Sequence, residues 1–179
     1  MPVSFRAASV SDMATLLPMM EALWAHERIR FDADAIRAAL EDLFADPGLG
    51  RVWLASIEET VTGYAMGTWG FSTEQGGRFL LLDELFVLPP YRGQGVAGAT
   101  LAFVESEAGR EGARAVRIEV SEENGPAREL YRTAGYTDPR RLFLAKRLAS
   151  AAAPGPMPSG LTGETPASVS EQASPHVPA

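Results

Sequence analysis

The segment Arg92-Gly93-Gln94-Gly95 combines a cationic side chain with two glycines, between an apolar run and a helical pattern. Glycine adopts positive φ angles without strain and lets a ligand approach the backbone with no Cβ in between. The free N–H groups and the positive dipole end at a helix start favour an anion such as pyrophosphate, and Arg92 adds positive charge. The pattern therefore predicts a phosphate-binding bend; the alternative is a tight turn that binds no ligand.

Several other kinds of site are excluded by what the chain lacks. The glycine segment has neither the Gly-Lys-Ser/Thr of nucleoside-triphosphate loops nor the third glycine of dinucleotide-binding loops. There is no cysteine, which excludes disulfides, thiolate metal ligands and an acyl-cysteine intermediate. The two histidines, His26 and His176, are far apart in the sequence, so we predict no metal site.

The net charge of −7 bears on the partners of the chain. Nucleic acids and anionic lipid surfaces are bound by clustered Lys and Arg, so we expect neither and favour a cationic partner. The sequence has no apolar stretch of about 18 residues and no basic, apolar leader. We therefore expect no membrane span and a cytoplasmic location.

The composition predicts one domain followed by a tail. With 46% hydrophobic and 22% charged residues, the 179-residue chain has the profile of a globular domain with a sizeable core. We predict that this domain spans residues 1–149. Ser150–Ala179 is rich in Pro, Ala, Ser and Gly without apolar periodicity, which predicts a disordered tail; a docking peptide is the alternative.

Hydrophobic periodicity predicts an α/β fold, a mixed sheet with helices on its faces. The predicted strands are Val3–Ala7, Arg51–Ile57, Val61–Trp69, Phe79–Leu88, Ala115–Val120 and Arg141–Leu148, the second and third forming a hairpin. The predicted helices run from Ser9 or Ser11 to His26 with a kink at Pro18, from Asp32 to Ala45, from Ala97 to Gly109 or Gly112, and from Asn124 to just before Gly135.

Two segments resemble signatures of the GCN5-related N-acetyltransferase (GNAT) superfamily. Residues 92–97, Arg-Gly-Gln-Gly-Val-Ala, resemble its Arg/Gln-x-x-Gly-x-Gly/Ala motif, and residues 120–136, VSEENGPARELYRTAGY, are similar to its Asn-x-x-Ala-x-x-Leu-Tyr segment. The resemblance in element order extends from Val3 to Leu148. It implies the acyl-CoA N-acyltransferase fold, whose mixed central β-sheet is splayed between two strands and carries helices on both faces.

The resemblance implies acetyl-CoA as co-substrate. It places the pyrophosphate on the main chain of Arg92–Ala97, and the pantetheine arm and acetyl carbonyl on the preceding strand at Phe86–Leu88, where a bulge splays the sheet. Pro89 and Pro90 fit locally, because proline cannot continue a strand ladder. The implied cofactor-binding residues are Phe86, Val87, Leu88, Arg92, Gly93, Gln94, Gly95, Val96, Ala97 and Asn124.

Acetyl transfer to an amine requires removal of a proton from that amine, and a nearby carboxylate can act as the base. Glu84 is our first choice, because it interrupts an apolar strand and acids at this place are common in the superfamily. Asp83 is the alternative: strand alternation sends the two acids to opposite faces, and the sequence does not tell which face meets the substrate. Either acid could instead pair with an arginine.

Tyr131 is the second candidate catalytic residue. It shares an apolar helix face with Ala127, Leu130 and Ala134, so it should point inward. Asn124 lies almost two turns earlier on the same side. We predict that Asn124 contacts the cofactor arm while Tyr131 reaches the leaving sulfur. The alternatives are a core tyrosine and a helix-capping asparagine.

The acids and the net charge favour a small cationic primary amine as acceptor. Without a cysteine to carry the acetyl group, we favour direct attack within a ternary complex. The resemblance implies that the acceptor site is formed by the first two helices, Asp12–Ala45, and the loop Ser72–Arg78. Its candidate walls are Trp24, His26, Glu27, Trp69 and Phe71. The alternatives are a protein acetyltransferase acting on an N-terminus or lysine, and a non-catalytic acyl-CoA-binding module. The resemblance allows a homodimer.

Overall fold

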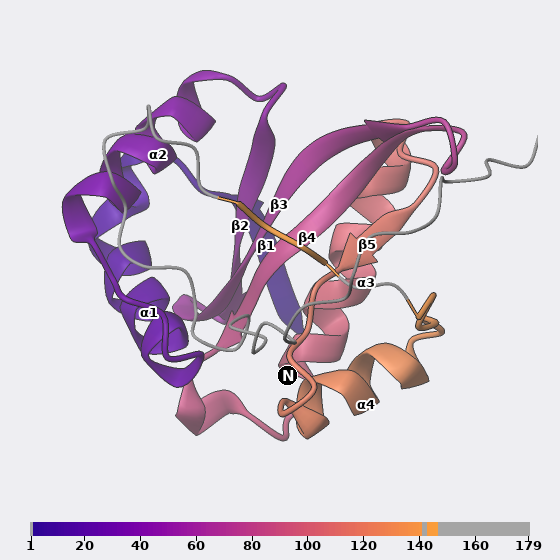
Figure 1. Ribbon diagram of the computed structural model, residues 1–179. Coiled ribbons are helices and arrows are strands. Elements are labelled where there is room, and N and C mark those ends of the chain that lie inside the picture. Colours follow the sequence, from indigo (N-terminus) through magenta and orange to yellow (C-terminus); the bar gives the residue numbers. More distant parts are fainter. Residues whose placement is uncertain (1, 141–142, 147–179) are drawn as a thin grey trace, which may run out of the picture.

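The computed structural model describes residues 2–140 and 143–146, which contain a mixed β-sheet with helices on both faces (Figure 1). The strands of this part are β1 (Val3–Ala7), β2 (Gly50–Ile57), β3 (Thr60–Ser72), β4 (Gly77–Val87) and β5 (Val116–Ile118). The α-helices are α1 (Met13–His26), α2 (Ala33–Ala45), α3 (Val96–Arg110) and α4 (Gly125–Thr133), and the short 3-10 helices η1 (Val10–Asp12) and η2 (Pro89–Tyr91) precede α1 and α3.

The strands lie side by side in chain order, β1-β2-β3-β4-β5. The first four are antiparallel, and β5 pairs parallel to β4 after the chain has crossed over through α3. This arrangement confirms the predicted mixed α/β fold and the predicted hairpin of β2 and β3. None of the described helices combines the length and hydropathy needed to cross a bilayer.

Two apolar layers hold the helices on the sheet. The layer under α1 and α2 includes Leu16, Met20, Leu40, Leu54 and Tyr64. The layer under α3, on the opposite face, includes Leu80, Leu82, Leu101, Val104 and Ala108. Since successive strand residues point to opposite faces, the layer in which a strand residue packs shows which face it occupies.

A β-bulge at Asp83 interrupts the alternation of β4. The register pairs Met66 with Glu84 and Gly67 with Leu82, so Asp83 has no partner on β3. Leu80 and Leu82 face α3, whereas Glu84 and Phe86, which regular alternation would also place there, face α1. The resemblance had implied a bulge at Phe86–Leu88; the structure corrects its position.

The parallel pairing of β4 with β5 ends beside this bulge. Leu80, Leu81 and Leu82 pair with Val116, Arg117 and Ile118, and no pairing of these strands is found further along. β4 nevertheless continues to Val87. The two strands therefore part after Leu82, as the resemblance implied for two neighbouring parallel strands.

The remaining differences from the predicted elements concern their ends. β5 is shorter than the predicted Ala115–Val120, and α1 begins at Met13 after a 3-10 turn, with Pro18 inside the helix. The predicted last strand, Arg141–Leu148, is not found in residues 143–146, which have no regular secondary structure, and its other residues lie outside the described part, as does the predicted tail.

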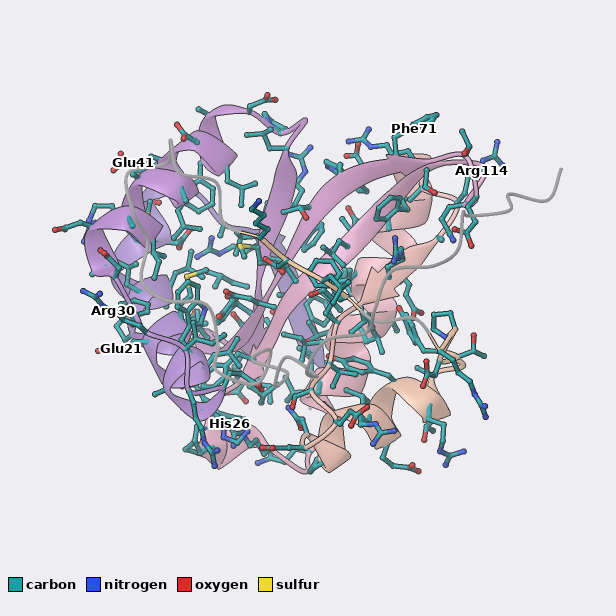
Figure 2. All side chains as sticks on the ribbon, viewed as in Figure 1. Glu21, His26, Arg30, Glu41, Phe71 and Arg114 are labelled. Atoms are coloured by element: carbon teal, nitrogen blue, oxygen red, sulfur yellow. The ribbon has the colours of Figure 1, made fainter. Side chains whose placement is uncertain are left out.

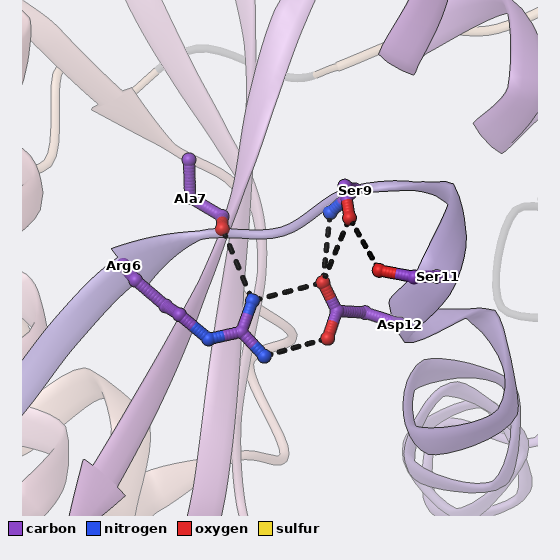
Figure 3. A network of polar contacts seen from close by, with 5 residues as sticks. All are labelled: Arg6, Ala7, Ser9, Ser11 and Asp12. Atoms are coloured by element: carbon purple, nitrogen blue, oxygen red, sulfur yellow. Dashed lines mark hydrogen bonds and ion pairs between the residues drawn. The ribbon is translucent and has the colours of Figure 1, made fainter.

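A polar network joins β1 to the start of α1 (Figure 3). The Arg6 guanidinium donates to both oxygens of Asp12, at 2.9 and 2.6 Å, and the Ser9 N–H donates to Asp12 Oδ2 at 2.9 Å. The hydrogen bond from Arg6 is the main reason why the pKa of Asp12 falls from its ordinary 3.8 to about 2. The network therefore stabilises the fold when Asp12 is ionised.

We predict that Asp12→Asn lowers the free energy of unfolding by about 1–2 kcal/mol at pH 7. This value already allows for solvent screening of the ion pair, because the Arg6 side chain is exposed. Because the folded-state pKa is depressed, the contribution is complete above pH 4 and is lost as the pH falls through about 2. Urea unfolding of both proteins across this range measures it. Glu129→Gln, which breaks the fully exposed pair with Arg132, is the control and should change stability little. An equal loss at all pH values would contradict the prediction.

Candidate active site

The bend predicted from the glycine segment lies between β4 and α3. Gly93 and Gly95 have φ angles of +73° and +82°, in the left-handed region that favours glycine, and Gly95 caps α3. A Cβ added to either residue would meet no atom within 4 Å. Backbone conformation, together with open space for a ligand, therefore explains the two glycines better than crowding does.

The backbone N–H groups of residues 93–98 are available to a ligand. None of them donates to an acceptor among the described residues, and the first helical bond of α3 runs from Ala99 N to Gly95 O at 3.0 Å. Free N–H groups at a helix start suit phosphate oxygens, because the helix dipole adds partial positive charge there. The bend thus has the donors that a pyrophosphate requires.

Arg92 and Gln94 partly serve the bend itself. Arg92 Nε donates to Val87 O at 2.9 Å, and its guanidinium lies 5.5 Å from the centre of the Phe86 ring. Gln94 Nε2 donates to Pro90 O at 2.9 Å. The backbone amides are therefore better placed than these two side chains to bind an anion.

The end of β4 presents two main-chain positions to the gap beside β5. Leu88 N donates to Thr62 O on β3 at 2.9 Å, and alternation turns the main-chain groups of Phe86 toward β3 as well. Those of Leu85 and Val87 consequently face the gap, although Arg92 already donates to the Val87 carbonyl. Leu85 was not among the predicted residues, because its direction depends on a strand register that local patterns do not contain.

Glu84 is buried between α1 and β3. Its Oε1 accepts from Trp24 Nε1 at 2.8 Å and its Oε2 accepts from the Tyr64 hydroxyl at 2.5 Å. Burial raises the pKa of Glu84; the two hydrogen bonds oppose this shift, and the charge of Asp83 adds to it. The alternative that Glu84 pairs with an arginine is not found among its contacts within the described residues.

Asp83 and Glu119 are the first residues of their chain segments beyond the point where β4 and β5 part. They directly follow the last pair of the ladder, Leu82 with Ile118. Asp83 is exposed, yet neighbouring protein desolvates its carboxylate enough to raise its pKa, and both partial burial and Asp83 raise the pKa of Glu119. Glu119 was missed because only the register of β5 brings it beside Asp83.

The bulge also brings Asp83 and Glu84 to the same face. Leu82 packs under α3, so alternation directs Asp83 to the other face of the sheet, under α1 and α2. Glu84 accepts a hydrogen bond from Tyr64 on that face. The prediction that these two acids face different sides of the sheet is therefore wrong, because it assumed an uninterrupted strand.

Tyr131 and Asn124 lie on and before α4. The Tyr131 ring contacts that of Tyr136 with 5.9 Å between centroids, and its hydroxyl has no hydrogen-bond partner among the described residues. Burial and the charge of Glu27 raise the pKa of Tyr131. Asn124 caps α4, accepting from Ala127 N at 3.2 Å, and its amide donates to Glu27 at 3.3 Å. The end of α1 and the start of α4 thus meet.

The predicted walls of the acceptor site do not all come together. Figure 2 shows Phe71 and His26 at opposite ends of the molecule, and Phe71 is 78% exposed on β3. Trp69 packs in the layer under α3 with the Arg78 guanidinium 4.1 Å from its ring centre. Of the predicted walls, Trp24, His26 and Glu27 lie at the end of α1, where Trp24 donates to Glu84.

These features can be compared with known proteins. A model of the acetyltransferase (GNAT) family matches residues 16–136. The chain belongs to this family. It is 27% identical over 148 residues to thialysine N-epsilon-acetyltransferase of Bos taurus, covering 76% of this chain and 85% of that protein. It is 26% identical over 136 residues to an uncharacterized N-acetyltransferase of Bacillus subtilis, covering 76% and 91%.

Solved structures agree with the fold of this GNAT protein. An integron cassette protein from a salt-marsh metagenome is 31% identical with a TM-score of 0.72, covering 82% of this chain and 91% of that one. An aminoglycoside N-acetyltransferase solved with CoA is 19% identical with a TM-score of 0.68, covering 82% and 95%, and supports the fold alone. The predicted fold and family are confirmed, and the chain is an acetyl-CoA-dependent N-acetyltransferase.

We predict that Gly95→Val weakens acetyl-CoA binding by about tenfold or more, because a β-branched residue resists a φ of +82° and would shift the amides of the bend. Titration calorimetry measures this change. Gly112→Val is the matched control: it also has φ +82° and open space, but it lies beyond the other end of α3. Equal affinity in the two variants would contradict the assignment of the bend to the pyrophosphate.

Proposed function

We propose that this GNAT enzyme moves the acetyl group of acetyl-CoA directly to a primary amine of a small cationic molecule. The observation that carries the proposal is the group of carboxylates, Asp83, Glu84 and Glu119, at the point where β4 and β5 part. A cationic amine is attracted to such a group, and the net charge of −7 favours its approach. A relative is named for thialysine, which is an amine.

In this proposal Glu84 is the base. The amine nitrogen forms a bond to the acetyl carbon, the carbon–sulfur bond of the thioester breaks, and the amine proton passes to Glu84 directly or through a water. Burial supports this role, because it raises the pKa of Glu84, and a carboxylate with a higher pKa is a stronger base. Asp83 and Glu119, which are more open to solvent, would attract the acceptor's positive charge.

Tyr131 is proposed to donate a hydrogen bond to the leaving sulfur. Its raised pKa keeps the phenol protonated at neutral pH, and its hydroxyl donates to no described residue. Asn124, Leu85, Val87 and the amides of residues 93–98 are proposed to hold acetyl-CoA. Because the chain contains no cysteine, these roles fit direct transfer without an acetyl-cysteine intermediate.

The experiment that tests the function is an assay of CoA release over a panel of amines. We expect a diamine to give a kcat/KM about tenfold higher at low salt than the monoamine in which one ammonium is replaced by a methyl group. The variant combining Asp83→Asn with Glu119→Gln should remove this preference, while Glu129→Gln on the exposed face of α4 should retain it. Preference for a lysine-containing peptide, or no release with any amine, would contradict the proposal.

We predict that Tyr131→Phe lowers kcat by about tenfold or more with little change in acetyl-CoA affinity, because the hydrogen bond is needed as the thiolate leaves. Steady-state kinetics and titration calorimetry measure the two quantities. Tyr136→Phe is the matched control, because its ring packs against Tyr131 in the same layer. Unchanged turnover in Tyr131→Phe would remove this residue from the mechanism.

A further inference from the structure

The geometry points to Trp24 and Tyr64 as positioning residues that hold the Glu84 carboxylate, one on each oxygen, for transfer of the amine proton. Trp24 Nε1 donates to Oε1 at 2.8 Å and the Tyr64 hydroxyl donates to Oε2 at 2.5 Å. The inference rests on the proposed role of Glu84 as the base. It adds two residues to that site.

The two donors reach Glu84 from different elements. Trp24 lies on α1 and Tyr64 on β3, 60 and 20 residues away in sequence. Each ring is itself fixed by packing: Trp24 meets Phe31 edge to face at 5.8 Å, and Tyr64 lies 6.1 Å from Phe86 with no exposed surface. Donors held so firmly restrict the rotation of the carboxylate between them.

The arrangement leaves Glu84 able to accept a proton. Each carboxylate oxygen has two lone pairs, and each donor uses one of them. Burial and the charge of Asp83 disfavour the anionic form of Glu84, whereas the two hydrogen bonds favour it. Burial and the Glu84 charge raise the pKa of Tyr64, so this phenol stays protonated and remains a donor throughout the reaction.

Within residues 2–140 and 143–146, the ionisable groups that act on the pKa of Glu84 are Asp83, which precedes it on β4, and Tyr64, which faces it from β3. Glu119, on the chain after β5, lies close enough to Asp83 for that charge to raise its own pKa. From α1 the contact is the uncharged indole of Trp24. Loss of either donor should therefore act on Glu84 itself and shift its protonation in one direction.

The test uses Trp24→Phe and Tyr64→Phe, which remove one donor each and keep an aromatic ring. Two measurements are made on the full chain: the pH dependence of kcat/KM for the best amine of the panel, and the pKa of Glu84 from carbon NMR of labelled glutamate, assigned with Glu84→Gln. Because each hydrogen bond favours the anion, we expect both the acidic limb and the NMR pKa to rise by about one unit in each variant.

Trp53→Phe is the matched control, since it removes a buried indole from the layer under α3. It should affect stability without moving either quantity. Thermal unfolding of all variants identifies a variant that fails to fold, in which case the other donor variant still decides the outcome.

The outcomes separate this inference from the proposed function. An NMR pKa that stays at the wild-type value in the folded donor variants overturns the role of Trp24 and Tyr64. An NMR pKa that rises while the acidic limb stays in place overturns it as well, because Glu84 is then held by its two donors without serving as the base. A rise in both quantities supports the inference.

Discussion

One extra residue in β4, Asp83, determines how the active face of this protein is built. Without the bulge, alternation would direct Glu84 and Phe86 into the apolar layer under α3, where an unpaired carboxylate is costly. With it, Glu84 reaches Trp24 and Tyr64 on the other face. The parallel pairing with β5 ends at the same place, so the bulge and the gap between the strands occur together.

The described residues include two regions of opposite electrostatic character. The amides of residues 93–98, at the positive end of the α3 dipole, suit the phosphates of acetyl-CoA. The carboxylates of Asp83, Glu84 and Glu119 suit a positively charged amine. The groups that suit an anion and those that suit a cation are thus different residues of the chain.

Glu84 shows how burial and hydrogen bonding balance in such a site. Burial raises the pKa of this carboxyl group and so disfavours its charged form. The indole of Trp24 and the phenol of Tyr64 offset part of that cost by hydrogen bonding and add no positive charge beside the carboxylate. Two neutral donors therefore hold this acidic side chain inside the protein.

Local sequence was enough to predict the features that depend on neighbouring residues: the glycine bend at 93–95, the apolar faces of α2 and α3, the cap of α4 at Asn124, and the family motifs. The position of the bulge, the shared face of Asp83 and Glu84, and the place of Glu119 and Leu85 at the gap could be found only in the folded chain. The physical reason is that backbone preference and periodicity are local, whereas strand register results from side chains that pack across long stretches of chain. Trp24 lies 60 residues before Glu84 and meets it only because α1 packs on the sheet in the layer that includes Leu16, Met20 and Tyr64.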